Sequence, residues 1–341
     1  MKVPTPRKLK SGNWFIQLRL NGESIPITAA TARECKQIAE LTKAEHQAGK
    51  TEIKKLPKNT TLQEAMEKYI AANKATLSPP TARSYISYSK NRFPKYRNLY
   101  LSKIDWQKMI DDELKDVSEK TVKNAWRLVT PSLKFIDYPV PSVRLSPVPV
   151  KEIPFLQPEE IKPFCEALKG RSYEIAALLE LHGLRLSEVK GLTWKDIDLK
   201  NNVMLIKGAM VRGTNGMVKK PQNKNRTSTR PVPIMIPQLH DALEAVPNKT
   251  GTVVTLNGGT LLEDVRRSCK RAGVTIVTNH GLRHSFASLC FHLKTIPIKQ
   301  IQEWGGWKDD DVLNRIYIRL SATMKSENQQ TFMKFFEDSK N

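Results

Sequence analysis

The chain is poor in the features that mark membrane, secreted or zinc-binding proteins. No apolar run approaches the roughly 20 residues that a transmembrane helix needs. The first ten residues are polar and lack the apolar segment of a secretory signal, so we expect no signal. The four cysteines lie far apart with no CxxC pair, which argues against a structural zinc site and fits a reducing cytoplasm. These cysteines are Cys35, Cys165, Cys269 and Cys290.

Acidic residues and nucleotide-binding motifs are also scarce. The 341 residues include 34 Asp and Glu against 56 Lys and Arg, a formal net charge of +22. Such an excess is typical of a polyanion binder, and nucleic acid is the leading partner. A membrane surface would require a lipid anchor or a basic amphipathic helix, and the sequence shows neither. Without a Walker loop or a GxGxxG motif, nucleotide hydrolysis and dinucleotide binding have no support.

The pattern of apolar residues predicts a multidomain α+β protein that begins with a small three-stranded sheet and a helix. Polar and apolar residues alternate over 13–27 around an Asn21-Gly22 hairpin turn, and a helical pattern follows over 31–47. The lysine-rich stretch 49–59 reads as a linker. The basic residues of this segment fit DNA contact and an ordinary solvated face about equally well. They are Lys8, Lys10, Arg19, Arg33 and Lys36.

The rest of the chain is predicted to be mainly helical. Apolar spacing over 60–138 predicts four or five short helices with starts near Thr61, Ser78, Ser102 and Ser118. The proline-rich stretch 139–155 cannot continue a helix or a central strand, and is the predicted interdomain linker. From residue 156 we expect a mixed, mostly helical domain with a small antiparallel sheet. Its strands are predicted at 203–211 and 230–236.

The first candidate residue of that domain is an arginine at a helix start. Gly183 follows an apolar helix ending at His182, so it suits a helix C-cap and Arg185 begins the next helix. Arginines in such places are commonly just solvated. Glu188, however, is close enough to hold the guanidinium in one orientation.

A basic hairpin is the second candidate feature. Residues 207–230 contain seven basic residues and no acidic one between two predicted strands. This pattern predicts a hairpin that projects positive charge. Lys224 is our candidate within it, and Lys219 and Lys220 are competitors.

A helix start at 278–286 is predicted to carry a phosphate pocket. Its apolar stripe is Leu282, Phe286, Leu289 and Leu293. His280, Arg283 and His284 fall on the other side, beside a helix N-terminus that itself favours anions. A lone histidine is usually structural, but three such donors together favour a binding site. Gly281 stands where the HExxH zinc motif requires glutamate, which argues against zinc.

The last candidate residues are Trp307 and Tyr317. The sequence Trp-Gly-Gly-Trp over 304–307 predicts a tight turn, and Asp309, Asp310 and Asp311 begin a helix. Consecutive aspartates on a helix point in different directions, so capping explains them better than a metal-dependent nuclease site. Tyr317 lies at the edge of the buried stripe, where a packing tyrosine is the common alternative.

Together these groups supply the chemistry of metal-free phosphodiester cleavage. A tyrosine can attack phosphorus, two arginines can stabilise the charge on the non-bridging oxygens, and a lysine can protonate the leaving oxygen. Imidazole and indole groups can donate further hydrogen bonds. The sequence therefore predicts a DNA strand-exchange enzyme that uses no metal and no other cofactor.

In this order the motifs resemble the tyrosine recombinase (phage integrase) family, over essentially the whole chain. Residues 183–188 are similar to its first arginine box, and 280–284 to its second. The segment 224–233 is similar to its hairpin lysine segment, which favours Lys224 over its competitors. Trp307 stands where the family usually has histidine, and Tyr317 falls in the place of the nucleophile. The interval between these two residues is one residue longer than the family pattern.

The resemblance implies an arm-type DNA-binding domain at 1–56, a helical core-binding domain at 57–138, a linker at 139–155 and a catalytic domain at 156–341. The implied catalytic residues are Arg185, Lys224, His280, Arg283, Trp307 and Tyr317, with Glu188 and His284 in support. The implied DNA-binding residues are Lys8, Lys10, Arg19, Lys219, Lys220 and Arg226. DNA would be cut and rejoined through a 3′-phosphotyrosyl intermediate.

The resemblance also implies the partners and the setting. They are double-stranded attachment sites, a homotetramer on DNA formed from free monomers, a host DNA-bending protein and an excisionase, in a bacterial cytoplasm at the nucleoid. The carrier would be a phage or a conjugative element. The segment 321–341 is apolar enough to dock as a helix, in cis or on a neighbouring protomer. The alternatives are a type IB topoisomerase-like enzyme, which uses similar chemistry, and a catalytically silent DNA-binding regulator.

Overall fold

The computed structural model describes residues 3–9, 11–20, 23–47, 59–149, 151–221, 229–307 and 311–323, together with positions 329 and 333. The chain divides into two compact units, one formed by 1–72 with 88–145 and the other by 73–87 with 146–341. Helices dominate both units, and small antiparallel sheets complete an α+β fold, as predicted. Within the described ranges, no helix combines the length and apolar character needed to cross a membrane.

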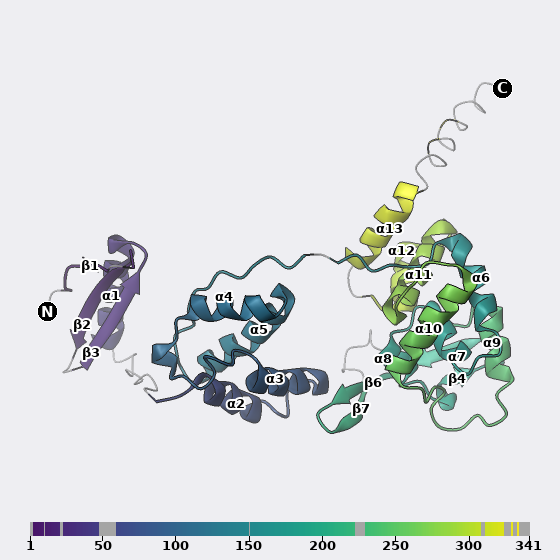
Figure 1. Cartoon of the computed structure of the whole chain (residues 1–341), viewed down its shortest axis with the longest axis horizontal. Helices are drawn as coiled ribbons and strands as arrows, with labels where there is room; N and C mark the ends of the chain where they lie inside the picture. Colours follow the sequence, from purple (N-terminus) through teal and green to yellow (C-terminus); the bar gives the residue numbers. More distant parts are fainter. Residues whose placement is uncertain are drawn as a thin grey trace. The chain divides into compact units, whose positions relative to one another are not determined.

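The first unit begins with the predicted three-stranded sheet and helix (Figure 1). Strands β1 (Arg7–Lys8), β2 (Trp14–Leu20) and β3 (Glu23–Ala29) pair antiparallel, and helix α1 (Ala32–Gln47) packs on one face. Alternate residues of β2 point to that face, so Ile16, Leu18 and Leu20 are buried. Arg19 lies on the open face. The predicted Asn21-Gly22 turn lies outside the described residues.

Four helices and a short 3-10 turn follow in the chain, at nearly the predicted places. They are α2 (Leu62–Ala72), α3 (Pro79–Asn91), η1 (Leu101–Lys103), α4 (Trp106–Asp116) and α5 (Glu119–Phe135). Ser118 caps α5 through a hydrogen bond from the Thr121 amide, as its sequence predicts. The start predicted near Ser102 is wrong by one turn, because Ser102 lies in η1 and the Asp105 side chain caps α4 instead.

The second unit surrounds helix α7 (Glu174–Leu181) with helices and places two small sheets at its edge. Its other helices are α6 (Pro158–Leu168), α8 (Leu186–Val189), α9 (Pro237–Glu244), α10 (Gly258–Ala272), α11 (Asn279–His292), α12 (Ile298–Gly305) and α13 (Asp311–Thr323), with the 3-10 turn η2 (Trp194–Asp196). One sheet has the order β4 (Ile197–Asp198), β5 (Val203–Ile206) and β8 (Arg230–Pro233), and the other is the hairpin of β6 (Gly208–Gly213) and β7 (Gly216–Pro221).

The strand predicted over 203–211 is two strands that belong to different sheets. β5 pairs with β8, whereas β6 pairs with β7, and the change of partner falls at Lys207. At that point the Lys207 amine forms an ion pair with Asp196 at 3.0 Å. The predicted strand 230–236 also ends early, at Pro233, because its partner β5 begins opposite that residue, at Val203, and the Met235 amide donates to the His182 ring instead.

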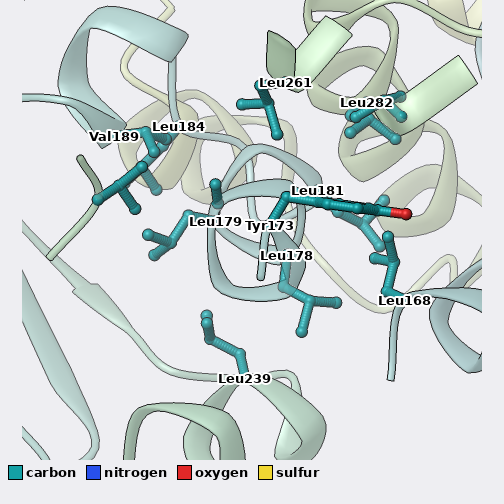
Figure 2. Close-up of a cluster of buried hydrophobic side chains, with 14 of the residues drawn as sticks. Leu168, Tyr173, Leu178, Leu179, Leu181, Leu184, Val189, Leu239, Leu261 and Leu282 are labelled. Atoms are coloured by element: carbon teal, nitrogen blue, oxygen red, sulfur yellow. The ribbon is translucent and has the colours of Figure 1, made fainter. Parts of the chain in front are cut away.

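The core of the second unit is built around α7, in which every residue from Ala176 to Leu181 is buried. Figure 2 shows its leucines among side chains from the neighbouring helices, including Leu239 of α9 and Leu282 of α11. Leu178 and Leu179 are completely buried. The end of the proline-rich segment joins this unit, because the Leu156 amide donates to the Ser285 hydroxyl at 2.8 Å.

One acidic residue, Glu180, is enclosed in this apolar helix. Its carboxylate is fully buried, and neither oxygen makes a hydrogen bond of normal geometry within the described part of the chain. Burial raises the pKa of Glu180 from 4.5 to about 8, and the Asn279 side-chain amide opposes that effect only in part. Glu180 is therefore protonated in the folded protein at neutral pH.

This buried proton makes stability depend on pH. Between pH 4.5 and 8 the folded state holds a proton that the unfolded state has lost, so the free energy of unfolding falls as pH rises. The slope is at most about 1.4 kcal/mol per pH unit. His182, whose pKa burial lowers from 6.5 to about 4, acts in the opposite sense at lower pH.

Replacement of Glu180 by glutamine should remove most of this slope, because the amide has no proton to lose. Urea unfolding of the wild type and of Glu180→Gln between pH 6.5 and 8 measures it. Glu263→Gln, which changes a carboxylate 63% exposed on α10, is the matched control and should leave the slope unchanged. Equal slopes in the wild type and Glu180→Gln would contradict the assignment.

Candidate active site

Three arginines from distant parts of the sequence meet at the C-terminal end of α12. The last carbonyl groups of a helix have no partner within the helix and carry the negative end of its dipole. Here the Gly306 carbonyl accepts from Arg185 at 2.7 Å, and the Trp304 carbonyl accepts from Arg230 at 2.9 Å. The Gly305 carbonyl accepts from both Arg230 and Arg283. The end of α12 thus binds three positively charged guanidinium groups.

A glycine pair permits this approach. Gly306 ends α12 in the left-handed conformation, with φ of +65°, and a Cβ there would lie 2.8 Å from the Arg230 guanidinium carbon. At Gly305, a Cβ would overlap the Trp307 ring. The tight turn predicted at 304–307 is therefore present, and both glycines are required by close contacts with the side chains of the site.

Glu188 is the only acidic side chain hydrogen-bonded to these arginines among the described residues. The Arg185 amide and Nη1 both donate to it at 2.9 Å, so one carboxylate fixes the backbone and the side chain of Arg185 at the start of α8. Burial acts to raise the pKa of Glu188, but hydrogen bonds and charges from Arg230 and Arg185 outweigh it, and the pKa is lowered. Glu188 therefore remains a carboxylate at neutral pH.

Arg283 is the most buried arginine of the cluster, with 1% of its surface exposed. Its Nη1 donates to the carbonyls of Gly183 and Gly305, and its guanidinium carbon lies 4.0 Å from the centroid of the Trp307 ring. Stacking on indole compensates part of the cost of burying the charge. Its Nε and Nη2 are buried without a hydrogen-bond partner in the part of the chain that the structure describes.

The arrangement of charges favours an anion at the cluster. Burial lowers the pKa of Arg283 to about 9, and the nearby positive charges of Arg185 and Arg230 add to the effect. The Arg283 guanidinium is still protonated at neutral pH and has donors without partners. In the cluster as a whole, one carboxylate faces three positive charges. Arg185 is 41% exposed, and among the described residues it makes two of the five hydrogen bonds that a guanidinium can donate. A phosphate group would satisfy the remaining donors of Arg185 and Arg283.

The two histidines of α11 lie beside this cluster. The His280 and His284 rings are 4.5 Å apart and perpendicular, and both belong to the first turns of the helix. Burial lowers the pKa of His280, and the charges of Arg283 and Arg185 lower it further. His280 is therefore neutral at pH 7 and able to accept a proton.

Helix α11 differs from the predicted amphipathic helix. Arg283 and His284 are buried at 1% and 5% exposure, whereas Leu293, expected in the apolar stripe, is 50% exposed. After its first residues the helix passes through the interior of the second unit, so Arg283 and His284 are buried while His280 at its start is exposed. The spacing of apolar residues along a helix cannot by itself show whether the polar side faces solvent or other parts of the protein.

Tyr317 lies apart from the cluster. Its side chain is 53% exposed on α13, and its ring packs against Phe291 with centroids 5.3 Å apart. Phe291 follows Arg283 by eight positions on α11, which is about 12 Å along a helix. Within the described residues, no hydrogen bond joins the Tyr317 hydroxyl to the arginines. The neighbouring Leu313 and Ile316 are buried, and they hold α13 in the same apolar cluster as Phe286.

The structure thus gathers Arg185, Glu188, His280, Arg283, His284 and Trp307 and leaves Tyr317 outside. Lys224, Arg226 and Lys10 lie outside the described residues. Lys8 and Arg19 are exposed on the N-terminal sheet, Lys219 is exposed on β7, and Lys220 beside it is half-buried. Arg230 is the member of the cluster to which sequence reasoning assigned no role. Its only signal was its place at a strand start directly after the basic loop.

A cavity of about 440 Å³ lies elsewhere in the second unit. Its lining is mainly apolar, with Leu181, Phe286 and Leu289 among the lining residues, and it includes none of the arginines. It is therefore distinct from the candidate site. Among the residues that the structure describes, no group of three His, Cys, Asp or Glu side chains is arranged to hold a metal ion.

Comparison with known proteins assigns the family. The model of the phage integrase family matches residues 154–324, half of the chain. A tyrosine recombinase XerC-like protein of Caldanaerobacter subterraneus subsp. tengcongensis is 28% identical over 216 residues, which cover 54% of this chain and 55% of that protein. The chain spans about half the length of the curated relatives that it matches.

Two solved structures share the fold. The Tn1549 transposon integrase in complex with transposon right end DNA has a TM-score of 0.61 and 18% identity, over 78% of this chain and 99% of that chain. A lambda integrase tetramer bound to a Holliday junction has a TM-score of 0.52 and 16% identity, over 92% and 94%. The family match covers α6 to α13 and hence the whole arginine cluster, and the chain belongs to the phage integrase family.

Proposed function

We propose that this protein is a site-specific DNA recombinase, the integrase of a mobile element, which cuts and rejoins DNA through a 3′-phosphotyrosyl intermediate. The observation that carries the proposal is the arginine cluster, in which Arg283 has buried donors without partners beside the exposed donors of Arg185. A phosphodiester has the charge and the oxygen geometry to satisfy both. Family membership supports the same reading.

The proposed chemistry proceeds by in-line displacement at phosphorus. The Tyr317 oxygen forms a bond to phosphorus as the bond to the 5′ oxygen breaks, and attack by a 5′-hydroxyl of a partner strand reverses the step. Arg185 and Arg283 stabilise the negative charge that develops on the non-bridging oxygens, and the Trp307 indole donates to one of them. Free tyrosine has a pKa of about 10, so neutral His280 assists by accepting the phenol proton.

Lys224 is proposed as the general acid that protonates the leaving 5′ oxygen. In the sequence it falls between β7 and β8, and β8 begins with Arg230 of the cluster. Lysine is suited to this role because its amine can give up a proton, whereas an arginine guanidinium holds its proton at any ordinary pH.

The remaining segments are proposed to bind DNA. The open face of the N-terminal sheet carries Gln17, Arg19 and Ser24, polar groups of the kind that read bases from a strand in a groove. We assign residues 1–56 to an arm-type domain, 57–138 to a core-binding domain, 139–155 to a linker and 156–341 to the catalytic domain. The net charge of +22 supports extensive contact with phosphates.

The proposed assembly is a homotetramer on DNA that forms from free monomers. The similarity to a lambda integrase tetramer bound to a Holliday junction supports it. Attachment sites of a phage or conjugative element are the proposed substrates, with a host DNA-bending protein and an excisionase as partners at the nucleoid. A type IB topoisomerase-like activity can be distinguished from recombination by experiment, since such an enzyme would relax supercoiled DNA without joining two sites.

Tyr317→Phe should bind DNA with unchanged affinity and form no covalent adduct. The substrate is a nicked half-site duplex taken from the boundary of the element that carries the coding sequence, where short direct repeats mark the insertion. The nick lets the short 5′ fragment leave and traps the phosphotyrosyl link, which denaturing gel electrophoresis detects. An adduct that persists in Tyr317→Phe would remove this residue from the mechanism.

The separation of Tyr317 from the arginines requires either movement of α13 or a tyrosine from a neighbouring protomer. We propose movement of α13 within one protomer. A mixture of Arg185→Ala and Tyr317→Phe proteins should then form no more adduct than either variant alone. Recovery of the adduct in the mixture would instead establish donation between protomers, since only then can one complete site assemble.

Lys224→Ala should slow cleavage of ordinary DNA by roughly 100-fold or more, the usual contribution of a general acid. A half-site with a bridging sulfur at the 5′ position should restore its rate to near that of the wild type, because thiolate leaves without a proton. Lys219→Ala and Lys220→Ala are the matched controls and should show no such difference between the two substrates. Failure of the sulfur substrate to rescue Lys224→Ala would assign the proton to another group.

A further inference from the structure

Arg230 is built into the arginine cluster in a different way from Arg185 and Arg283. It is 6% exposed, and its guanidinium makes four hydrogen bonds to protein groups. The Nη1 and Nη2 atoms bind the two oxygens of Glu188 at 3.2 and 2.9 Å, and the Nε and Nη2 atoms bind the Trp304 and Gly305 carbonyls at 2.9 and 3.3 Å.

The number of available donors separates the roles of the three arginines. A guanidinium has five N–H donors, and Arg230 uses four of them on the protein. Within the described residues Arg185 and Arg283 each make two side-chain hydrogen bonds, which leaves each of them three donors for a ligand. Arg230 therefore lacks the free donors that a phosphate would require.

Two of the three partners of Arg230, Glu188 and Gly305, are also partners of a phosphate-facing arginine. Oxygen Oε1 of Glu188 accepts from both Arg230 and Arg185. The Gly305 carbonyl accepts from both Arg230 and Arg283. A side chain that clamps both acceptors at fixed angles sets the position of both functional guanidinium groups.

We propose that Arg230 is a positioning residue for the cleavage reaction, which orients Arg185 through Glu188 and Arg283 through the end of α12. This inference rests on the proposed function. Loss of the clamp removes two hydrogen bonds from the Glu188 carboxylate, takes the side-chain donor from the Trp304 carbonyl and leaves the Gly305 carbonyl to Arg283 alone. The arginines would then meet the phosphate out of alignment, and a misplacement of about 1 Å can reduce a rate about 100-fold.

The test compares adduct formation by the wild type, Arg230→Met and Arg230→Lys on the nicked half-site. Methionine matches much of the length without charge, and lysine keeps the charge but cannot bind a carboxylate through two parallel hydrogen bonds. Both variants should bind DNA within about two-fold of the wild type and form adduct about 100-fold more slowly. Arg266→Met, which changes an exposed arginine on α10, is the matched control and should match the wild type.

A second substrate separates positioning from loss of fold. A methylphosphonate at the scissile position replaces a charged non-bridging oxygen with a methyl group, so it has less charge for the two arginines to neutralise. The ratio of wild-type to Arg230→Met rates should therefore be at least ten-fold smaller on this substrate than on ordinary DNA. Thermal unfolding of every variant, measured in parallel, reports the folded fraction.

The outcomes are distinct. Wild-type rates in both Arg230 variants would overturn the positioning role and leave the proposed function intact. An equal loss on both substrates, in step with a lowered melting temperature, would also overturn it, because Arg230 would then serve only the fold. Absence of adduct in the wild type itself would overturn the proposed function and this inference together.

Discussion

The candidate site depends on one interaction, the capture of guanidinium groups by the carbonyl groups that end α12. Arg185, Arg230 and Arg283 come from three different elements, and like charges so close together repel one another. The helix dipole, the Glu188 carboxylate and the Trp307 ring together offset that repulsion. Because the compensation is incomplete, the cluster retains a positive charge and open donors that a phosphate completes.

The same interaction links the fold to the site. The two glycines at the end of α12 allow side chains to approach the backbone, and the buried carboxylate of α8 reaches both Arg185 and Arg230. The core around α7 fixes the relative positions of α8 and α11, which carry Arg185 and Arg283. A change in the packing of α7 would therefore be transmitted to the proposed phosphate-binding arginines without any contact with DNA.

Local signals in the sequence were sufficient for most of the fold. Alternation predicted the N-terminal hairpin, Ser118 predicted the start of α5, and the Gly305-Gly306 pair predicted the turn after α12. The pairing of Arg185 with Glu188 also follows from spacing, since three residues bring side chains together at a helix start.

The features that sequence did not predict depend on contacts between distant residues. Arg230 meets Glu188 across 42 positions and Gly305 across 75, and no local pattern encodes either contact. The burial of α11 has the same origin, because the helices that cover its polar side come from other parts of the chain. The division of the predicted strand at Lys207 arises because β5 and β6 pair with different strands, and the alternation of residues within a strand does not predict its partner.

The outward position of Tyr317 has a consequence for how such a protein would search a genome. A strongly basic chain binds transiently to many DNA sites that are not its substrate, and the phosphodiester bonds of those sites must stay intact. In the proposed mechanism, contact of the Tyr317 ring with Phe291 would let Arg185 and Arg283 bind and release each phosphate without attack by the phenol. The proposed movement of α13 would then confine strand breakage to the correct partner DNA.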